Sequence, residues 1–496
     1  MSGHWFMAWA VATALIGALC QARRTLLLGP KLLLFAGTFL AAQRGSLLLP
    51  RPLSEIQAGL LGAKTGNKQK AGQVRSCPSF GPRMGHSGNS GMSNEESGGN
   101  ASQDSGVLVV MRSVELFVGA GGLGIGVSQA GFRPAAVMDW DRWACDTLRE
   151  NKERSLDPIA HWPIDEGDVR QFNFGTIPGL VDLVTGGPPC QPFSMGGRHR
   201  AFLDSRDMFP QGIRAVRELR PRAFIFENVK GLTRSSFANY LEYIRLQLTY
   251  PALVAKQDEE WLAHLARLED HHTRAGEIGL HYRVVLRVLN AADFGVPQRR
   301  ERVFFVGFRA DTGIEWHFPK PSHSRDALLW SQWREGTYWD AHRVALKARP
   351  EDNAAKQRAL KIPTKPIEEP WITVRDAICD LPDPEIAQSK ALSIHDHRFQ
   401  PGARSYAGHT GSPLDEPAKT LKAGVHGVPG GKNMLRRPDG SVRYFTIRES
   451  ARLQTFPDDM VFHGSWTETM RQLGNAVPCR LARTIASELR DKLLEV

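Results

Sequence analysis

The stretch SVELFVGAGGLG spans residues 113–124 and combines three local patterns. Its first half, 113–118, is an apolar run that predicts a buried strand. The glycine-rich half predicts a turn in which backbone N–H groups approach a ligand, and a helix is predicted to follow at about 125–130. A strand, a glycine turn and a helix start favour an α/β fold with a nucleotide-type site, but a single turn of this kind often only connects two elements.

A second predicted strand, 135–138, ends in Asp139, Trp140 and Asp141. In a Rossmann-like fold a carboxylate after the second strand is placed to bind ribose hydroxyls, and an indole can stack on a base. The alternatives are a helix cap for either aspartate and a core position for the tryptophan. Asp168, in a later turn, is another acidic candidate whose alternative is an Asx turn.

The stretch GGPPCQPFS at 186–194 follows the apolar run 180–184, which predicts a short buried strand. Its prolines and glycines hold Cys190 in a fixed turn at the end of that strand. Open α/β sheets bind ligands at this edge, so Cys190 is a candidate nucleophile. The alternative is an inert buried cysteine.

A further strand is predicted to deliver a carboxyl group to the same edge. A helix predicted at 207–219 leads into the apolar run 223–226, and Glu227 and Asn228 come directly after it. Burial at such a position raises the pKa of a carboxyl and lets it act as a proton donor. The alternative for Glu227 is a cap at the strand end.

The segment 298–302 carries polar and basic residues directly before a strand predicted at 303–307. Alternation places Gln298, Arg300 and Arg302 on one face of the chain. Two guanidinium groups on one face suit a phosphate or a carbonyl oxygen. The alternative is a solvated basic edge strand.

Charge and cysteine usage narrow the class of protein. The net charge is +11; the first 110 residues carry ten Lys and Arg against four Asp and Glu, so the remainder carries about +5. That modest excess is compatible with a polyanionic partner. Six scattered cysteines form no CxxC pair, which argues against a zinc site and a disulfide framework and indicates a reducing cytoplasm.

Composition divides the chain into four segments. Residues 1–110 hold two short apolar runs and a Gly-, Ser- and Lys-rich stretch, and we interpret them as a disordered extension or a mis-set translation start; a signal or membrane anchor is the alternative. The segments 111–318 and 441–496 carry regular α/β patterns, with a charged helix at 256–270 expected to be an exposed insertion. The segment 319–440 is rich in Pro, Gly, His and Trp and predicts an inserted, loop-rich module.

Taken together, eight motifs resemble those of the DNA cytosine-5 methyltransferases of bacterial modification systems. In chain order they are Phe117–Gly124, Asp139-Trp140, Asp168, Pro188–Gln191, Glu227–Val229, Gln298–Arg302, Arg448–Pro457 and Gly474–Pro478. The resemblance begins at about Ser113 and leaves out 1–110. It implies a Rossmann-like, S-adenosylmethionine-dependent catalytic domain in two parts, 111–318 and 441–496, with an inserted target-recognition domain, 319–440.

The resemblance also implies a reaction and its catalytic residues. The thiolate of Cys190 would add to carbon 6 of cytosine and Glu227 would protonate ring nitrogen 3, so that carbon 5 takes the methyl group. Asn228, Arg300 and Arg302 would position the base and the catalytic loop. The substrate would be a specific short sequence of double-stranded DNA, whose target base must be flipped out of the helix.

The same resemblance assigns binding residues. The cofactor S-adenosylmethionine would be held by Phe117, Gly119, Gly121, Gly122, Asp139 at the ribose, Trp140 at the adenine, Asp168 at the adenine amino group, Pro189 and Asn475. The substrate would be contacted by Gln191, Ser194, Gln298, Arg404 and Lys422, with Lys419, Lys432, Arg436 and Arg437 as further DNA contacts. We expect a monomer in the cytoplasm without metal, and either a cognate restriction endonuclease acting on the same site or an orphan enzyme.

Three other functions were weighed against this one. A tRNA cytosine-5 methyltransferase of the same fold typically carries a Cys-Phe-Thr signature that is absent from this sequence. A dinucleotide-binding oxidoreductase would have no use for the Pro188–Gln191 and Gln298–Arg302 motifs. A non-catalytic DNA-binding relative is disfavoured because Cys190 and Glu227 are both present.

Overall fold

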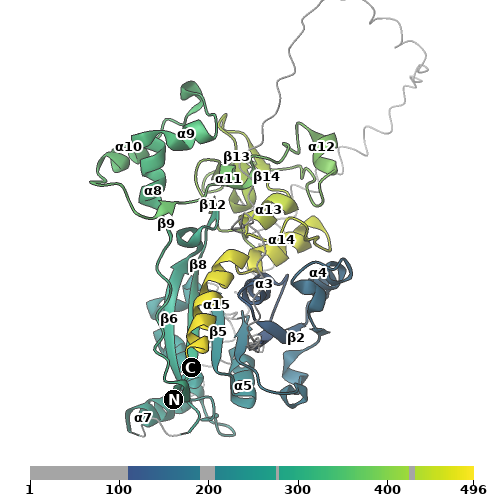
Figure 1. Cartoon of the computed structure of the whole chain (residues 1–496), viewed down its shortest axis with the longest axis vertical. Coiled ribbons are helices and arrows are strands. Elements are labelled where there is room, and N and C mark those ends of the chain that lie inside the picture. Colours follow the sequence, from purple (N-terminus) through teal and green to yellow (C-terminus); the bar gives the residue numbers. More distant parts are fainter. Residues whose placement is uncertain (1–109, 190–206, 275–278, 424–430) are drawn as a thin grey trace, which may run out of the picture. The chain divides into compact units, whose positions relative to one another are not determined.

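The computed structural model describes residues 110–189, 207–274, 279–423 and 431–496 (Figure 1). The extension predicted at the N-terminus and the candidate residues Cys190, Gln191 and Ser194 lie outside the described residues. No helix within those ranges is both long and apolar enough to cross a membrane.

A seven-stranded sheet with the order β3-β2-β1-β4-β5-β8-β6 organises the described chain. Its strands are β1 Arg112–Leu116, β2 Arg133–Asp139, β3 Ile164–Glu166, β4 Leu183–Gly186, β5 Ala223–Val229, β6 Tyr282–Asn290 and β8 Glu301–Arg309. The first five in spatial order run parallel, whereas β8 pairs antiparallel with both β5 and β6. The predicted Rossmann-like α/β fold is confirmed.

Helices cover both faces of this sheet (Figure 1). They are α3 Gly122–Gln129, α4 Arg142–Glu153, α5 Phe209–Leu219, α6 Ala238–Thr249, α7 Trp261–Arg274 and α15 Cys479–Leu494. Helices α5, α6 and α7 share an apolar cluster with Phe224 and Phe226 of β5, while α3 and α15 share another with Ala223 and Ile225 on the opposite face. Because β5 is covered on both sides, its first residues, 223–226, are all apolar and do not alternate with polar ones.

The helix predicted at 256–270 as an exposed insertion differs from the structure. Helix α7 begins at Trp261, and one side of it is buried through His264, Leu265 and Leu268. The His264 ring lies 2.8 Å from the hydroxyl of Tyr243 on α6. The helix is amphipathic, and its apolar side packs on its neighbour, so the segment is not an insertion exposed on every side.

The elements between β8 and the C-terminal helices are short, as the sequence predicted. They are β9 His323–Ser324, α8 Arg325–Trp330, α9 Thr337–Ala341, α10 Asn353–Leu360, β10 Glu369–Pro370, α11 Val374–Ile378, α12 Gln388–Leu392, β11 Ser412–Pro413, β12 Ala418–Lys419, β13 Met434–Arg436 and β14 Val442–Tyr444. Helices α8 and α9 enclose a small apolar cluster that contains Trp339. By contrast, Val374 and Leu421 share a cluster with Ile125 of α3. The limits 319–440 of an inserted module stay a prediction.

The C-terminal part of the chain returns to regular helices. Helix α13, Ile447–Leu453, overlaps the motif quoted at 448–457, α14 spans Trp466–Asn475, and Pro478 directly precedes α15. A two-residue strand, β7 Gln298–Arg299, pairs in parallel with β12 and joins the inserted region to the end of the sheet.

Candidate active site

A cavity of about 320 Å³ opens at the carboxyl edge of the sheet, where β1, β2, β4 and β5 end. Predicted site residues from distant parts of the sequence line it together. They are Phe117, Gly119, Asp139, Trp140, Pro189, Glu227, Asn228, Arg302 and Asn475. Four strand ends and the segment after α14 therefore converge on one place, as expected for a ligand site in an open α/β sheet.

The carboxyl group of Glu227 forms a buried ion pair at this cavity. Its Oε1 lies 2.8 Å from Nε of Arg302, and only 8% and 12% of the two side chains are exposed. The antiparallel register of β5 and β8, with Val229 opposite Arg302, sets this contact. Burial raises the pKa of Glu227, and the guanidinium groups of Arg302 and Arg300 oppose that rise without cancelling it. A carboxyl whose pKa is raised in this way suits a proton donor.

The turn that leads to Cys190 is held from the side by Asn228. Its Nδ2 donates a 3.0 Å hydrogen bond to the carbonyl of Pro188. Pro188 and Pro189 both line the cavity beside Glu227. Cys190 lies outside the described residues, so the structure shows where the chain approaches it and not its side chain.

The acidic motif after β2 forms the other side of the cavity. The two carboxylate oxygens of Asp139 accept the N–H groups of Gly119 at 2.7 Å and Asp141 at 2.8 Å, and burial raises the pKa of this carboxyl. Asp141 is the N-cap of α4, so the helix-cap alternative is correct for it. Trp140 is 67% exposed, so the core alternative is wrong for this residue and its indole is open to a ligand.

The glycine-rich turn serves the site in two ways. Phe117 and Gly119 both have φ of +54°, and a side chain on Gly119 would meet no atom within 4 Å, so the space beside it is open. Gly121 instead packs against Trp162, and a Cβ on Gly122 would overlap the carbonyl oxygen of Val477. Gly121 and Gly122 are thus absent from the cavity lining, and their described contacts fit the turn against its neighbours.

Asp168 does not join the other candidates. Its Oδ1 accepts the N–H of Arg170 at 3.0 Å and its carboxylate also pairs with that guanidinium. The Asx-turn alternative describes this geometry, and Asp168 is not among the residues that line the cavity. Its contact with an adenine amino group stays a prediction.

Gln298 and Arg300 lie behind the cavity wall. Both are 0% exposed, so the solvated-edge alternative is wrong. Gln298 accepts from the N–H of Leu421 at 3.0 Å and donates to the carbonyl of Leu453 at 3.1 Å. Arg300 donates to the carbonyl of Gly474 at 2.8 Å. In the described structure both side chains are thus directed to the protein, and the substrate contact predicted for Gln298 and the positioning role predicted for Arg300 stay predictions.

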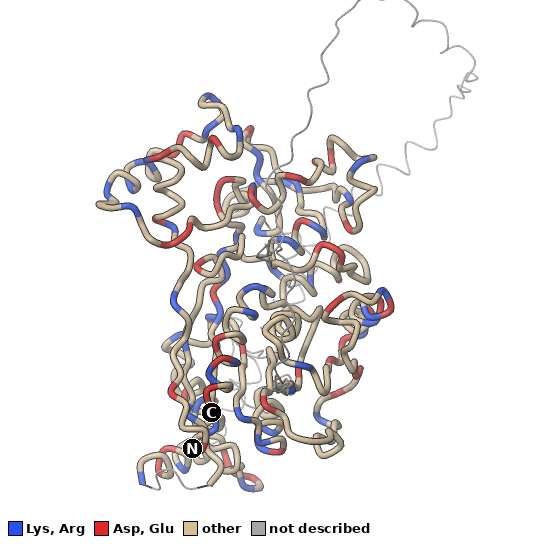
Figure 2. Tube along the Cα trace, viewed as in Figure 1, with Lys and Arg blue, Asp and Glu red and all other residues tan. Residues whose placement is uncertain are grey.

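Four of the predicted DNA contacts are exposed in the inserted region: Arg404, Lys422, Lys432 and Arg436. Basic and acidic side chains are interspersed along the described chain (Figure 2). Gln191 and Ser194, predicted to contact the substrate, lie outside the described residues. The structure leaves these contacts as predictions.

Two other predicted DNA contacts have partners within the protein. The Nζ of Lys419 lies 3.0 Å from the hydroxyl of Thr410, and burial together with nearby cations lowers its pKa. Arg437 forms ion pairs with Asp383 at 3.0 Å and Glu385 at 2.7 Å. The charge of Arg437 is therefore compensated within the protein, and its DNA contact stays a prediction.

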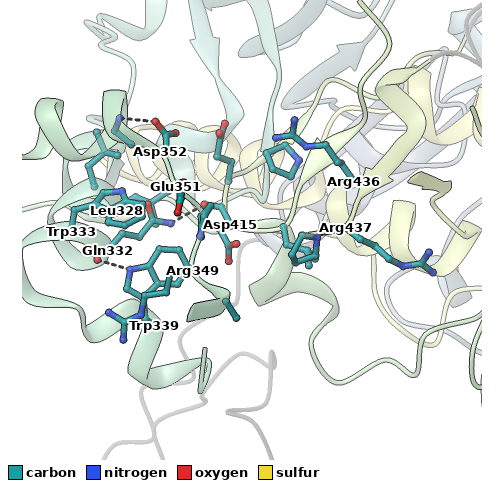
Figure 3. A pocket seen from close by; sticks show the side chains of 18 of the residues that line it. Leu328, Gln332, Trp333, Trp339, Arg349, Glu351, Asp352, Asp415, Arg436 and Arg437 are labelled. Carbon is teal, nitrogen blue, oxygen red and sulfur yellow. Dashed lines mark hydrogen bonds between the residues drawn. The ribbon is translucent and has the colours of Figure 1, made fainter. Parts of the chain in front are cut away.

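A larger cavity, of about 750 Å³, lies within the inserted region (Figure 3). Trp333, Trp339 and Arg349 line one side of it and Arg436 the other, while Arg437 extends away from these side chains. Acidic residues such as Asp415 are part of the same lining. This cavity is lined by none of the residues around Glu227 and Asp139, so it is separate from the candidate active site.

Arg471 in the cavity lining and Gln454 behind it are among the residues that were not predicted for the site. Arg471 on α14 forms a 2.6 Å ion pair with Asp141 and lines the cavity. Gln454 belongs to the motif quoted at 448–457, but its position in the sequence indicates no partner; in the structure it is fully buried behind Asn475. Only the tertiary structure brings these side chains to the site. The described residues contain no cluster of side chains that could hold a metal ion.

The mixed sheet and the cavity at its carboxyl edge define the class of fold as a Rossmann-like α/β fold with a ligand-type cavity at the strand ends. A family model described as C-5 cytosine-specific DNA methylase matches residues 111–249 and 268–491. The Type II methyltransferase M.PspPI of Psychrobacter sp. (strain TA137) is 32% identical over 379 residues, which cover 76% of this chain and 78% of the relative. M.NgoFVII of Neisseria gonorrhoeae is 33% identical over 393 residues, covering 77% and 88%.

Among solved structures, the Dnmt2 methyltransferase of S. pombe aligns with 16% identity and a TM-score of 0.45, covering 77% of this chain and 99% of that one. The chain belongs to the C-5 cytosine-specific DNA methylase family. It is a DNA cytosine-5 methyltransferase, which confirms the resemblance found in the sequence, and the family match begins at residue 111, after the N-terminal segment.

Proposed function

We propose that this protein transfers a methyl group from S-adenosylmethionine to carbon 5 of cytosine in a specific short sequence of double-stranded DNA, through a covalent adduct between Cys190 and the base. One observation carries the proposal: Glu227 with Arg302, Asp139 with Trp140, and Pro189, the residue before Cys190, all line a single cavity. A proton donor, a nucleoside-type site and the approach to a thiol thus meet at one strand edge.

The chemistry follows from the weak nucleophilicity of cytosine carbon 5. When the Cys190 thiolate forms a bond to carbon 6, the electrons of the 5,6 double bond become available at carbon 5. A proton passed from Glu227 to ring nitrogen 3 prevents negative charge from accumulating there. S-adenosylmethionine, when bound, supplies an electrophilic methyl group on a positively charged sulfur. After transfer, the carbon 5 proton is lost to a base, its electron pair restores the double bond as the sulfur–carbon 6 bond breaks, and the proton on ring nitrogen 3 returns to Glu227, so that 5-methylcytosine and the Cys190 thiolate are released.

The residues around Glu227 prepare it for this role. Arg302 fixes the orientation of the carboxyl, and the burial of the pair keeps its pKa raised. Asn228 ties the Pro188 carbonyl to the end of β5, so the chain approaching Cys190 is held against the same strand that carries the proton donor. Such fixed placement of donor and nucleophile lowers the entropic part of the barrier.

The residues on the other side of the cavity fit the proposed methyl donor. The open space beside Gly119 admits a ligand close to the backbone, and the exposed indole of Trp140 offers a stacking face for adenine. Each carboxylate oxygen of Asp139 accepts one backbone N–H and retains a second acceptor position, which ribose hydroxyls can use.

Replacing Trp140 by alanine tests this assignment. We expect the Kd for S-adenosylhomocysteine to rise about tenfold, because an exposed aromatic face that stacks on a base contributes about 1–3 kcal/mol. Isothermal titration calorimetry with the full-length protein measures the change. Trp330→Ala, a tryptophan of the inserted region, serves as the control and should bind as the wild type does; equal binding by Trp140→Ala would contradict the stacking role.

The inserted region would hold the DNA. Exposed Lys422, Lys432 and Arg436 follow one another along it and can pair with phosphates, while the aromatic and mixed-charge cavity beside Arg436 offers donors and acceptors for base edges. The names of the curated relatives, Type II methyltransferases, support a role in a restriction-modification system, in which a partner nuclease recognises the same sequence.

One experiment tests the function as a whole. The full-length chain is expressed in a host without cytosine methylation, and the host DNA is sequenced for 5-methylcytosine. Methylation at one short motif supports the proposal and identifies the recognition sequence. A folded protein that binds S-adenosylhomocysteine but leaves DNA unmethylated would contradict it, and methylation found in tRNA instead would establish the alternative substrate.

A further inference from the structure

We propose that Gln298 and Gln454 are positioning residues that couple the segment 418–423 to the cavity wall at Asn475. DNA bound at that segment and methyl donor bound in the cavity then raise each other's affinity. This inference rests on the proposed function, because both ligands come from it.

The inserted region is bound directly to β7. Ala418 lies opposite Gln298 in the parallel pairing of β12 with β7. The hydroxyl of Thr420 donates to the carbonyl of Arg299 at 2.6 Å, and the N–H of Leu421 donates to Oε1 of Gln298 at 3.0 Å. The segment that precedes the exposed Lys422 is therefore fixed to the side chain of one buried glutamine.

Gln298 is in turn hydrogen-bonded to a second buried glutamine, Gln454. The Nε2 of Gln298 donates to Oε1 of Gln454 at 3.0 Å. The Nε2 of Gln454 donates in turn to the carbonyls of Leu473 and Ala476, the latter at 3.2 Å. These two carbonyls flank Asn475, which lines the active-site cavity. Two side-chain amides in series thus connect Leu421 with the backbone on both sides of a cavity residue.

The two amides have little freedom to rearrange. Both glutamines are 0% exposed, and each uses its oxygen as an acceptor and its nitrogen as a donor to two groups. Rotating either amide would leave buried polar groups unpaired, which is strongly unfavourable in a low-dielectric interior. The pair therefore behaves as a rigid link and not as an adjustable polar contact.

Direct packing reinforces this link. A Cβ on Gly474 would lie only 2.6 Å from the backbone of Lys422 and Ala423, so these segments touch with no space for a side chain. Arg300 donates to the carbonyl of Gly474 at 2.8 Å and to that of Leu421 at 3.4 Å. A displacement of the segment 418–423 must therefore also displace Gly474 and the cavity wall at Asn475 that follows it.

Ligand coupling follows from this connection. DNA that restrains residues 421–423 also orders the cavity wall at Asn475. The methyl donor then binds more tightly, because it no longer has to order this wall itself. By thermodynamic linkage the donor must favour DNA binding by the same factor. A purely structural role for the two glutamines would affect stability but would leave this factor unchanged.

The test measures the coupling factor itself. The Kd of S-adenosylhomocysteine is determined by isothermal titration calorimetry for the full-length protein, alone and saturated with a duplex carrying the motif found by sequencing. We expect DNA to tighten binding about fivefold or more in the wild type. In Gln298→Leu and Gln454→Leu the factor should fall below about twofold, while each ligand still binds by itself.

Asn151→Leu is the matched control. Asn151 is also a 0% exposed amide, and it donates to the carbonyls of Thr147 and Val461 at 2.7 and 2.6 Å, away from both glutamines. This variant loses a comparable set of buried hydrogen bonds, so it should lose stability and keep the wild-type factor. The inference would be overturned if DNA left the Kd of S-adenosylhomocysteine unchanged in the wild type. It would also be overturned if both glutamine variants kept the wild-type coupling factor.

Hydrogen exchange provides a readout that needs no variant. Adding the duplex without methyl donor should slow amide exchange at 473–477 in the wild type, and unchanged exchange there would overturn the inference. A protein that methylates DNA but shows no coupling contradicts this inference alone. One that neither methylates DNA nor binds S-adenosylhomocysteine contradicts the proposed function.

Discussion

Replacing Glu227 by glutamine is expected to lower kcat for DNA methylation by about 10²- to 10⁴-fold. Glutamine keeps the size and polarity of the carboxyl, but it has no acidic proton to give to ring nitrogen 3. Binding should change little, because a glutamine side chain of the same size still lines the cavity beside Arg302. Single-turnover transfer of a labelled methyl group to a duplex, with Kd values for DNA and S-adenosylhomocysteine, separates the two effects.

The pH dependence of the same pair of proteins provides a second readout. Burial raises the pKa of Glu227, so its protonated, donating form persists to higher pH than in an exposed glutamate. Wild-type kcat should fall as pH rises through this pKa, and that descending limb should be absent from the slow Glu227→Gln enzyme. Glu218→Gln, on α5 outside the cavity lining, is the control. A Glu227→Gln enzyme with wild-type kcat would exclude the proton-donor role.

Replacing Cys190 by alanine is expected to reduce methylation by at least about 10⁴-fold, a loss comparable to removal of the covalent nucleophile in other enzymes. Without the thiolate no bond to carbon 6 can form, and carbon 5 stays unreactive. Sequencing of 5-methylcytosine in host DNA, under the conditions that reveal methylation by the wild type, provides the measurement. Cys379→Ala, which replaces an exposed cysteine outside the active-site lining, should methylate normally.

The covalent adduct can be trapped directly. In a duplex with 5-fluorocytosine at the target position, carbon 5 carries no proton to lose after methyl transfer, so the sulfur–carbon 6 bond cannot be broken by elimination. We expect a protein–DNA complex that survives denaturing electrophoresis with the wild type and is absent with Cys190→Ala. A stable complex formed equally by the alanine variant would show that another residue, or no covalent bond, is responsible.

The sequence predicted most of the α/β framework because its signals are local. The continuous apolar runs before Glu227 and Cys190 correspond to β5 and β4, and the glycine turn after β1 lies at the strand edge as expected. The grouping of Phe117, Asp139 and Glu227 in one cavity followed from the rule that parallel strands end at the same edge of a sheet.

The sequence could not predict contacts between side chains and partners that lie far apart along the chain. The alternating pattern of residues 298–302 predicted that Gln298 and Arg300 share one face. It could not indicate that these two side chains are buried against the backbone of Leu421 and Gly474. In Arg437 a basic residue in a basic region proved to be paired with two carboxylates more than fifty residues earlier.

The active-site cavity takes one wall from Phe117 and the opposite one from Asn475–Val477, near the two ends of the described chain. A ribosome makes the first wall early and the second among the last segments. A nascent chain therefore carries the catalytic stretch 186–190 well before it can hold a methyl donor. We therefore expect chains that lack the C-terminal segment to bind no methyl donor, because residues 475–477 of the cavity lining are then missing.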